Sequence, residues 1–281
     1  MGETKKRRGT ILKIGSDPEF VFYKNNHFVY ADDAQRGFRI RENSRIGRDG
    51  VQSIGELRPT ASSDPIKHFN NILKLILKLE EKFPGYEIRA GSSGGAYWNL
   101  GGHLHLDNLK SEQCKTLDFY LAIPVVFIEQ EPYSHMRHFA HSLSDSRFKR
   151  KNRGEYRTLS SWLVDPFICQ GILCLAFTIM NEIDNLNPGR FPRRFMELFK
   201  RGEFFHFENN LKAAIEKIPK LILYKDFKEE INFLLRLLEN KKTWNELQNI
   251  IPLWKNWEVD LKKYNKNPKK FILNRRRYLN R

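Results

Sequence analysis

Cysteine is scarce in this chain, and none of it is spaced like a metal or redox motif. Only Cys114, Cys169 and Cys174 occur among 281 residues. Cys169 and Cys174 lie in an apolar run, where cysteine behaves as a small core residue. A disulfide-stabilised module is therefore not expected, and a reducing, cytoplasmic compartment is.

Long hydrophobic segments are also missing. The start, "MGETKKRRG", lacks the apolar core of a signal peptide. The longest apolar run, residues 167–180, is shorter than the roughly 20 residues that span a bilayer, and Asp165 and Glu182 bound it. The run therefore predicts a buried helix, in keeping with a globular composition of 40% hydrophobic and 29% charged residues.

Glycine-rich phosphate loops are absent, since neither a Walker-type motif nor GxGxxG occurs. Acids are outnumbered, 33 against 49 Lys and Arg, so the formal charge is +16. Nine of these basic residues follow Asp260, with no acid among them. Such a tail can bind nucleic acid or another polyanion, or it can be a solvated surface. No nucleic-acid-binding motif accompanies it, which favours the solvated surface.

Alternating apolar and polar residues predict strands through the first third of the chain. The segments are "TILKIG", "EFVFY", "HFVYA", "VQSIGELRP", "YEIRAG" and "GGHLHLDN", and "GEYRTLSSW" follows later. Asp64 and Pro65 open an amphipathic helix, and Asp165 and Pro166 repeat that signal. Further helices are expected over 112–131, interrupted at Pro124, and near 207–218, 226–239 and 243–250.

Acids and histidines cluster with glycine and with these strand signals. Residues two apart share one face of an extended strand. The pairs with this spacing are Asp17 with Glu19, His103 with His105, and Glu155 with Arg157. Asp49 and Glu56 follow in "GRDGVQSIGELRP". Each motif alone has a simpler interpretation, because "DPE" is more often a turn and an HxH pair is more often half-exposed.

Several carboxylates on one buried sheet face would repel strongly unless cations lay between them. A divalent metal resolves that conflict. An oxygen-rich set with one or two imidazoles suits Mg²⁺ or Mn²⁺ better than zinc. Hard cations beside a basic segment suggest a nucleoside triphosphate held by metals and arginines.

The motifs "GSDPEF", "GRDG…GELRP", "GGHLHL" and "GEYR…SSW" occur in the order seen in phage-type COOH–NH2 ligases of the glutamine synthetase-like fold. The chain resembles that family over roughly residues 10–165 and is more distantly similar to glutamate–cysteine ligase. The resemblance implies an α+β fold: a mainly antiparallel, curved sheet with flanking helices and a helical C-terminal region.

The resemblance also implies roles for particular residues. The implied metal ligands are Asp17, Glu19, Asp49, Glu56, His103 and Glu155. Arg157 would contact the transferred phosphoryl group and act as a catalytic residue together with Glu56 and Glu155. Further candidates for ATP or phosphate are Arg147, Lys149, Arg150 and Arg153, although a solvated loop is the simpler interpretation of that run. His105 and Arg58 are candidates for substrate or metal.

The implied chemistry is an ATP- and Mg²⁺-dependent ligation. A donor carboxylate attacks the γ-phosphorus of ATP, and an amine then displaces phosphate from the acyl phosphate to form an amide. The expected partners are ATP, a carboxylate donor and an amine acceptor, with no membrane and with nucleic acid left open. The expected location is the cytoplasm, that of the host if a phage encodes the chain.

The expected organisation has four parts: a basic tail over 1–9, the ligase domain over 10–188, a helical region over 189–260 and a basic tail over 261–281. A metal-dependent hydrolase using the HxH pair is one alternative, but the pair falls mid-chain without an eightfold βα repeat. A nucleic-acid-binding protein with a non-catalytic ligase-like core is the other. It is disfavoured because no motif has lost its charged residue.

Overall fold

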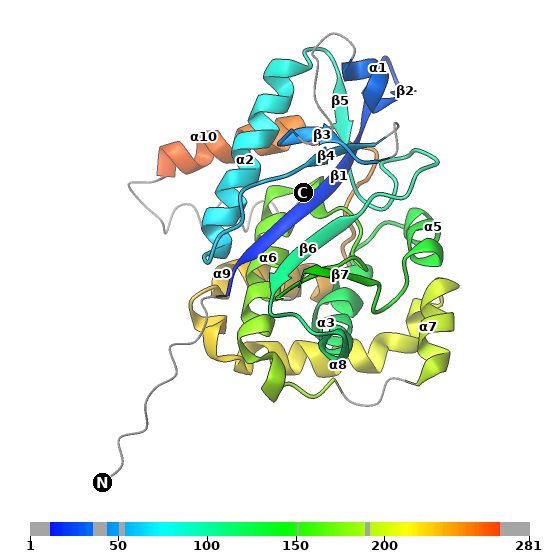
Figure 1. Cartoon of the computed structure of the whole chain (residues 1–281), viewed down its shortest axis with the longest axis vertical. Coiled ribbons are helices and arrows are strands. Elements are labelled where there is room, and N and C mark those ends of the chain that lie inside the picture. Colours follow the sequence, from blue (N-terminus) through cyan, green and yellow to red (C-terminus); the bar gives the residue numbers. More distant parts are fainter. Residues whose placement is uncertain (1–11, 36–43, 51–53, 151, 189–191, 265–281) are drawn as a thin grey trace.

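In a computed structural model, the described residues are 12–35, 44–50, 54–150, 152–188 and 192–264 (Figure 1). Their strands form one open antiparallel sheet in the order β3-β4-β1-β6-β8-β7, with β2 and β5 pairing to β1 off that path. The strands are β1 Ile14–Lys24, β2 His27–Val29, β3 Ile46–Arg48, β4 Gly55–Leu57, β5 Glu87–Arg89, β6 Gly102–Asp107, β7 Ser146–Arg150 and β8 Arg153–Tyr156. The expected α+β class is confirmed.

The helices lie around this sheet and along one side of it (Figure 1). They are α1 Ala31–Gln35, α2 Pro65–Lys82, α3 Cys114–Leu117, α4 Ile123–Val126, α5 Tyr133–Ala140, α6 Pro166–Glu182, α7 Arg193–Lys200, α8 Glu208–Lys217, α9 Lys228–Glu239 and α10 Ile251–Tyr264. Both expected N-caps are present: the Asp64 carboxylate accepts from the N–H of Ile66 at 2.8 Å, and that of Asp165 from the N–H of Phe167 at 2.7 Å.

Strand β1 runs diagonally through the molecule and organises the sheet (Figure 1). It is one strand, although the motif "DPE" is more often a turn. Pro18 is tolerated because it falls where β1 changes partner: Pro18 pairs with Gly102 at the start of β6, and Glu19 pairs with Glu56 on β4. The missing N–H of proline therefore interrupts no continuous ladder.

The two faces of the sheet are chemically different. Even-numbered residues of β1 and β6, such as Phe20, Phe22 and Leu104, belong to the main hydrophobic core. On this face the Ser16 hydroxyl lies 2.9 Å from Nε2 of His68 on α2, so α2 covers the even face. Odd-numbered residues of the same strands face the other way and carry the acids and histidines.

Helix α6 is apolar nearly all round and fills the core. With its last turn it spans Pro166–Asn185, 20 residues, which by length and composition alone could cross a membrane. The helix is therefore longer than the apolar run that it contains. Of its most apolar window, 89% is buried inside the protein, as expected of a core helix.

The structure tests the helices expected near Pro124 and near 243–250. The interruption near Pro124 is confirmed: a π-helix over Asp118–Ala122 precedes α4, in which Pro124 lies in the first turn. The helix expected near 243–250 is wrong, and α10 begins only at Ile251. Tertiary hydrogen bonds hold 243–250 in another conformation, since Trp244 N donates to Ile128 O at 2.9 Å and Glu246 N to Gln130 Oε1 at 2.8 Å.

One hydrophobic cluster contains buried residues from Ile14 to Trp257, on both sides of the expected boundary at residue 189. Helices α6 and α9 are in close contact within it. The four-part organisation stays a prediction, and its terminal tails, 1–9 and most of 261–281, lie outside the described residues.

Candidate active site

Cross-strand pairing gathers the acidic motifs into one row on the odd face. Directly opposed residues of antiparallel strands point to the same side of a sheet. The opposed pairs are Glu56 with Glu19, Asp17 with His103, Gly15 with His105, His105 with Glu155, and Glu155 with Arg147. Five strands thus contribute to one continuous charged surface.

This row lines a cavity of about 520 Å³. Its lining residues are Asp17, Glu19, Asp49, Glu56, Arg58, His103, His105, Arg147, Arg153, Gly154, Glu155 and Arg157. All but Gly154 are ionisable, and all but Gly154 are residues that the sequence singles out. Of the other candidates, Lys149 and Arg150 belong to β7, and their side chains lie outside the described part of the chain.

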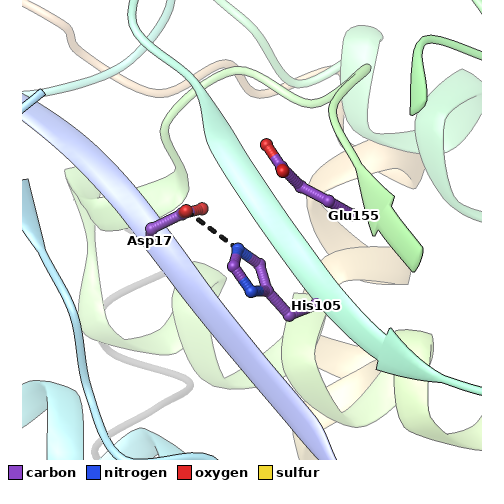
Figure 2. Close-up of side chains that lie close together, drawn as sticks. All are labelled: Asp17, His105 and Glu155. Carbon is purple, nitrogen blue, oxygen red and sulfur yellow. Dashed lines mark hydrogen bonds and ion pairs between the residues drawn. The ribbon is translucent and has the colours of Figure 1, made fainter. Parts of the chain in front are cut away.

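Imidazoles and carboxylates meet at one end of the cavity, the imidazole end, formed by Asp17, His103, His105 and Glu155. The His105 Nε2 atom lies 2.8 Å from Oδ2 of Asp17, and His103 Nδ1 lies 3.4 Å from its Oδ1 and 3.8 Å from Glu155 Oε1. Figure 2 shows Asp17, His105 and Glu155 pointing toward one another from β1, β6 and β8. Their ligand atoms all lie within 4.8 Å of one another, a spacing that one metal ion can bridge.

Glu19, Glu56 and Asp49 form the other end, the carboxylate end. Glu19 and Glu56 are 4% and 5% exposed. A Glu19 oxygen accepts from the backbone N–H of Gly101 at 2.5 Å, and the other lies 4.0 Å from His103 Nδ1. Glu56 pairs with Arg58. Asp49 lines the cavity beside them.

The pKa shifts of the carboxyl groups run in opposite directions at the two ends. Burial raises the pKa of Glu19, and burial together with the charge of Asp17 raises the pKa of Glu56 to about 9. Burial also acts to raise the pKa of Asp17, but hydrogen bonds from His103 and His105 outweigh it and hold that pKa below its usual range. For Glu19 and Glu56, the positive charge nearby therefore does not offset the cost of burying a carboxylate.

A hard divalent cation fits this donor set. Carboxylate oxygens dominate it, with two imidazoles, and the buried Oδ1 of Asp17 and Oε2 of Glu56 have ion-pair contacts, with His103 and Arg58, but no hydrogen bond of good geometry within the described part of the chain. A cation of this kind would supply positive charge next to the buried carboxylates and so favour their ionised form.

Two glycines make room for the site. A Cβ at Gly101 would lie 2.1 Å from Nε2 of His103, so only glycine lets that ring pack beside Glu19. A Cβ at Gly15 would lie 2.3 Å from Nη2 of Arg153. The glycines in "GSDPEF" and "GGHLHL" are therefore part of the site, and not only of turns.

The arginines of the cavity differ in their partners. Arg157 Nε and Arg147 Nη1 lie 3.4 and 3.7 Å from the two oxygens of Glu155. Besides pairing with Glu56, Arg58 donates to the backbone carbonyls of Ser44 and Arg48, at 3.1 and 2.8 Å. Arg58 thus braces β3 against β4, whereas Arg147 and Arg157 bracket an acid of the row.

Sequence reasoning missed the residues that hold this arrangement from behind. Arg137 on α5 is 1% exposed, and its Nη2 donates to the carbonyl oxygens of Arg157 at 2.6 Å and of Leu159 at 3.2 Å. Burial lowers its pKa to about 10, so it remains charged at neutral pH. The Ser161 hydroxyl donates to the backbone carbonyl of Glu19 at 2.5 Å. Only "SSW" gave any sequence signal, and nothing around Arg137 did.

The comparisons with known proteins agree with this geometry. The family model described as phage phiEco32-like COOH.NH2 ligase, type 2, matches residues 14–256. The match therefore extends well beyond residue 165, where the sequence motifs stopped, and takes in helices that the resemblance had left outside. No curated protein matches.

Solved structures do match, among them a bifunctional glutathione synthetase from Pasteurella multocida, with a TM-score of 0.53 and 9% sequence identity. The alignment covers 95% of this chain and 51% of that one, so the chain spans about half the length of that enzyme. At this identity the likeness shows a shared fold.

Proposed function

Because this chain belongs to the phage phiEco32-like COOH.NH2 ligase type 2 family, we propose that it is an ATP-dependent ligase that joins a carboxylate to an amine through an acyl phosphate. One feature of the cavity supports this function most directly. A row of carboxylates meets arginines on one sheet face, in a space whose described lining is ionisable at all positions but one. Such a space suits phosphates, carboxylates and hard cations together.

Asp17, His103, His105 and Glu155 would hold one Mg²⁺ or Mn²⁺, and Glu19, Glu56 and Asp49 would hold another. When bound, these ions would neutralise the triphosphate and the donor carboxylate, which otherwise repel each other. The chain itself fixes the ligands, because Gly101 N–H holds Glu19 and His105 holds Asp17.

Phosphoryl transfer would take place beside Glu155. An oxygen of the donor carboxylate forms a bond to the γ-phosphorus, and the bond from that phosphorus to the bridging oxygen breaks as ADP leaves. Arg157 and Arg147, on either side of Glu155, would stabilise charge on the equatorial oxygens. Arg137 holds the Arg157 backbone in place from behind.

Amide formation would follow at the same place. The amine nitrogen attacks the acyl carbon, the bond from that carbon to the phosphate oxygen breaks, and inorganic phosphate leaves. The amine also loses a proton, which Glu56 or Glu155 would accept. We also propose the cytoplasm as the location, because ATP is available there, and that of the host if a phage encodes the chain.

Incubation with Mg²⁺, ATP and a panel of carboxylates and amines tests the function. We expect ADP release that depends on the carboxylate, together with a new mass equal to the amide. Glu155→Gln is the control: it should abolish ADP release and leave the melting temperature nearly unchanged. Amide or ester hydrolysis without ADP release would instead indicate a metal-dependent hydrolase.

A further inference from the structure

Arg153 stands apart from the other cavity arginines. Arg147 and Arg157 lean on Glu155, and Arg58 pairs with Glu56. Within the described ranges of the chain, no carboxylate lies within ion-pair distance of the Arg153 guanidinium. Its half-buried side chain has a buried Nε that makes no hydrogen bond there. Among the residues that the structure describes, the Arg153 cation therefore has no carboxylate partner.

A partner was within reach and is not used. Asp107 on β6 lies directly opposite Arg153 on β8, so both side chains start from the same face. The Asp107 carboxylate instead accepts from the backbone N–H of Lys13 at 3.2 Å. Arg153 turns toward Gly15, where any Cβ would fall 2.3 Å from its Nη2. The glycine and the arginine together give the guanidinium its place in the cavity wall.

We propose that Arg153, seated over Gly15, is the receptor for a second anionic group of the carboxylate donor. The donor is then a dianion, such as a dicarboxylate, and not a simple monocarboxylic acid. This inference rests on the proposed ligase function, since it assigns the non-reacting end of the substrate. Arg153 therefore determines specificity, and the phosphoryl group belongs to Arg157 and Arg147.

Two features favour the donor over ATP as the ligand of Arg153. Arg153 and Arg157 are four residues apart, about 13 Å at the strand rise of roughly 3.3 Å per residue, with Glu155 between them. If the phosphoryl group lies beside Glu155, Arg153 is several ångströms too far away to bind it. A short dicarboxylate that reacts beside Glu155 can place its second carboxylate at Arg153. The cavity also has no apolar wall among its described lining residues, so a hydrocarbon chain would gain nothing by entering it.

Binding by calorimetry tests the receptor directly. Wild-type protein with Mg²⁺ and a non-hydrolysable ATP analogue is titrated with dicarboxylates from malonate to adipate, with aspartate and glutamate, and with the ω-monoamide of each. The monoamide keeps the length and removes one charge. We expect the best dianion to bind about 10- to 100-fold more tightly than its monoamide, the usual worth of a charge-assisted pair.

Two variants should remove that preference by different routes. Arg153→Met removes the cation. Gly15→Ala leaves it in the sequence but displaces it. The variant should fold, because the 2.3 Å clash is with the far end of a flexible side chain and the tight 3.2 Å contact with Ala61 Cβ needs a shift of a few tenths of an ångström. Arg201→Met is the matched control: it also loses one charge, from an exposed arginine that pairs with Glu203. A melting curve accompanies each variant.

Both cavity variants should bind the dianion no more tightly than its monoamide, while Arg201→Met keeps the wild-type ratio. A wild-type protein that does not discriminate between the two ligands would overturn the receptor. So would an Arg153→Met variant that loses ATP affinity and keeps the dianion preference, since Arg153 would then belong to the nucleotide.

Turnover separates the receptor from the ligase. Hydroxylamine serves as a small amine, and each hydroxamate formed is scored beside ADP. Dianion preference without ADP from any donor would remove the ligase function and leave the receptor. ADP and hydroxamate formed equally well from monoamides and dianions would retain the ligase and overturn the receptor.

Discussion

The two ends of the cavity use the same residue types and reach opposite electrostatic states. At the imidazole end, His103 and His105 hold the pKa of Asp17 low, and two arginines bracket Glu155. At the carboxylate end, burial raises the pKa of Glu19 and Glu56, and Arg58 is occupied partly by backbone carbonyls. The imidazole end thus has positive charge from its own residues, whereas at the carboxylate end burial outweighs the positive charge near Glu19 and Glu56.

The largest effect is expected for Arg157, whose positive charge lies at the proposed site of phosphoryl transfer. Arg157→Lys should fold and bind ATP, yet lose single-turnover ADP formation by a factor on the order of 10³, as for catalytic arginines elsewhere. The reason is that a lysine cannot hold two phosphoryl oxygens in a planar fork. Near wild-type ADP formation would remove Arg157 from the catalytic residues, and a loss that tracks the melting temperature would leave it only a structural one.

The raised pKa of Glu56 at the carboxylate end should make the free energy of unfolding depend on pH. Folded, metal-free protein keeps a proton on Glu56 up to about pH 9, whereas the unfolded chain loses it near the ordinary value of 4.5. The folded state therefore binds more protons in that window, and stability falls as pH rises through it. Glu56→Gln removes this loss, and it should unfold with a free energy about 2–4 kcal/mol higher than wild type at pH 8.

Two measurements serve as controls for the comparison of Glu56→Gln with wild type: unfolding at pH 5, and unfolding at pH 8 with Mg²⁺. Urea unfolding at pH 5 should show little difference between Glu56→Gln and wild type, and Mg²⁺ at pH 8 should stabilise wild type more than the variant. Wild-type stability that stays level between pH 5 and 8 without metal would show that the carboxylate end is already neutralised by the protein.

Asp17 gives the opposite pH dependence at the imidazole end. Its folded pKa lies below the unfolded one, so its stabilisation is present above the ordinary value of 3.8 and is lost as pH falls below it. Asp17→Asn should flatten the acid limb of the stability curve and leave the pH 5–8 window unchanged. An acid limb identical to that of wild type would contradict the pairing with His103 and His105.

The smallest effect on catalysis is expected from loss of the basic C-terminal residues. Deletion of residues 265–281 removes seven of the nine basic residues that follow Asp260, and ADP formation with a small donor should be unchanged. If the tail binds a polyanion, the deletion should also abolish retention on nucleic acid and reduce its salt dependence. Intact protein that shows no retention at moderate salt would leave the tail as a solvated basic surface.

Local sequence patterns predicted single helices and strands better than they predicted which segments pack or pair with one another. Asp64–Pro65 and Asp165–Pro166 placed two helix starts because capping depends on adjacent residues. The helix expected at 243–250 failed because Glu246 is claimed by distant groups: its carboxylate accepts from the N–H of Ser92 at 2.7 Å and of Ser93 at 3.0 Å. Strands β3 and β7 were missed, since short polar segments become strands only beside a partner.

The sequence by itself determined which side chains share a face. A spacing of two residues in a strand settles that for Asp17 with Glu19, for His103 with His105 and for Glu155 with Arg157, whatever lies alongside. Only the tertiary structure decided which of them meet. Register places Glu19 opposite Glu56 and His105 opposite Glu155, and packing left Arg153 over Gly15 with no carboxylate partner among the described residues, because such pairings depend on chain segments distant in sequence.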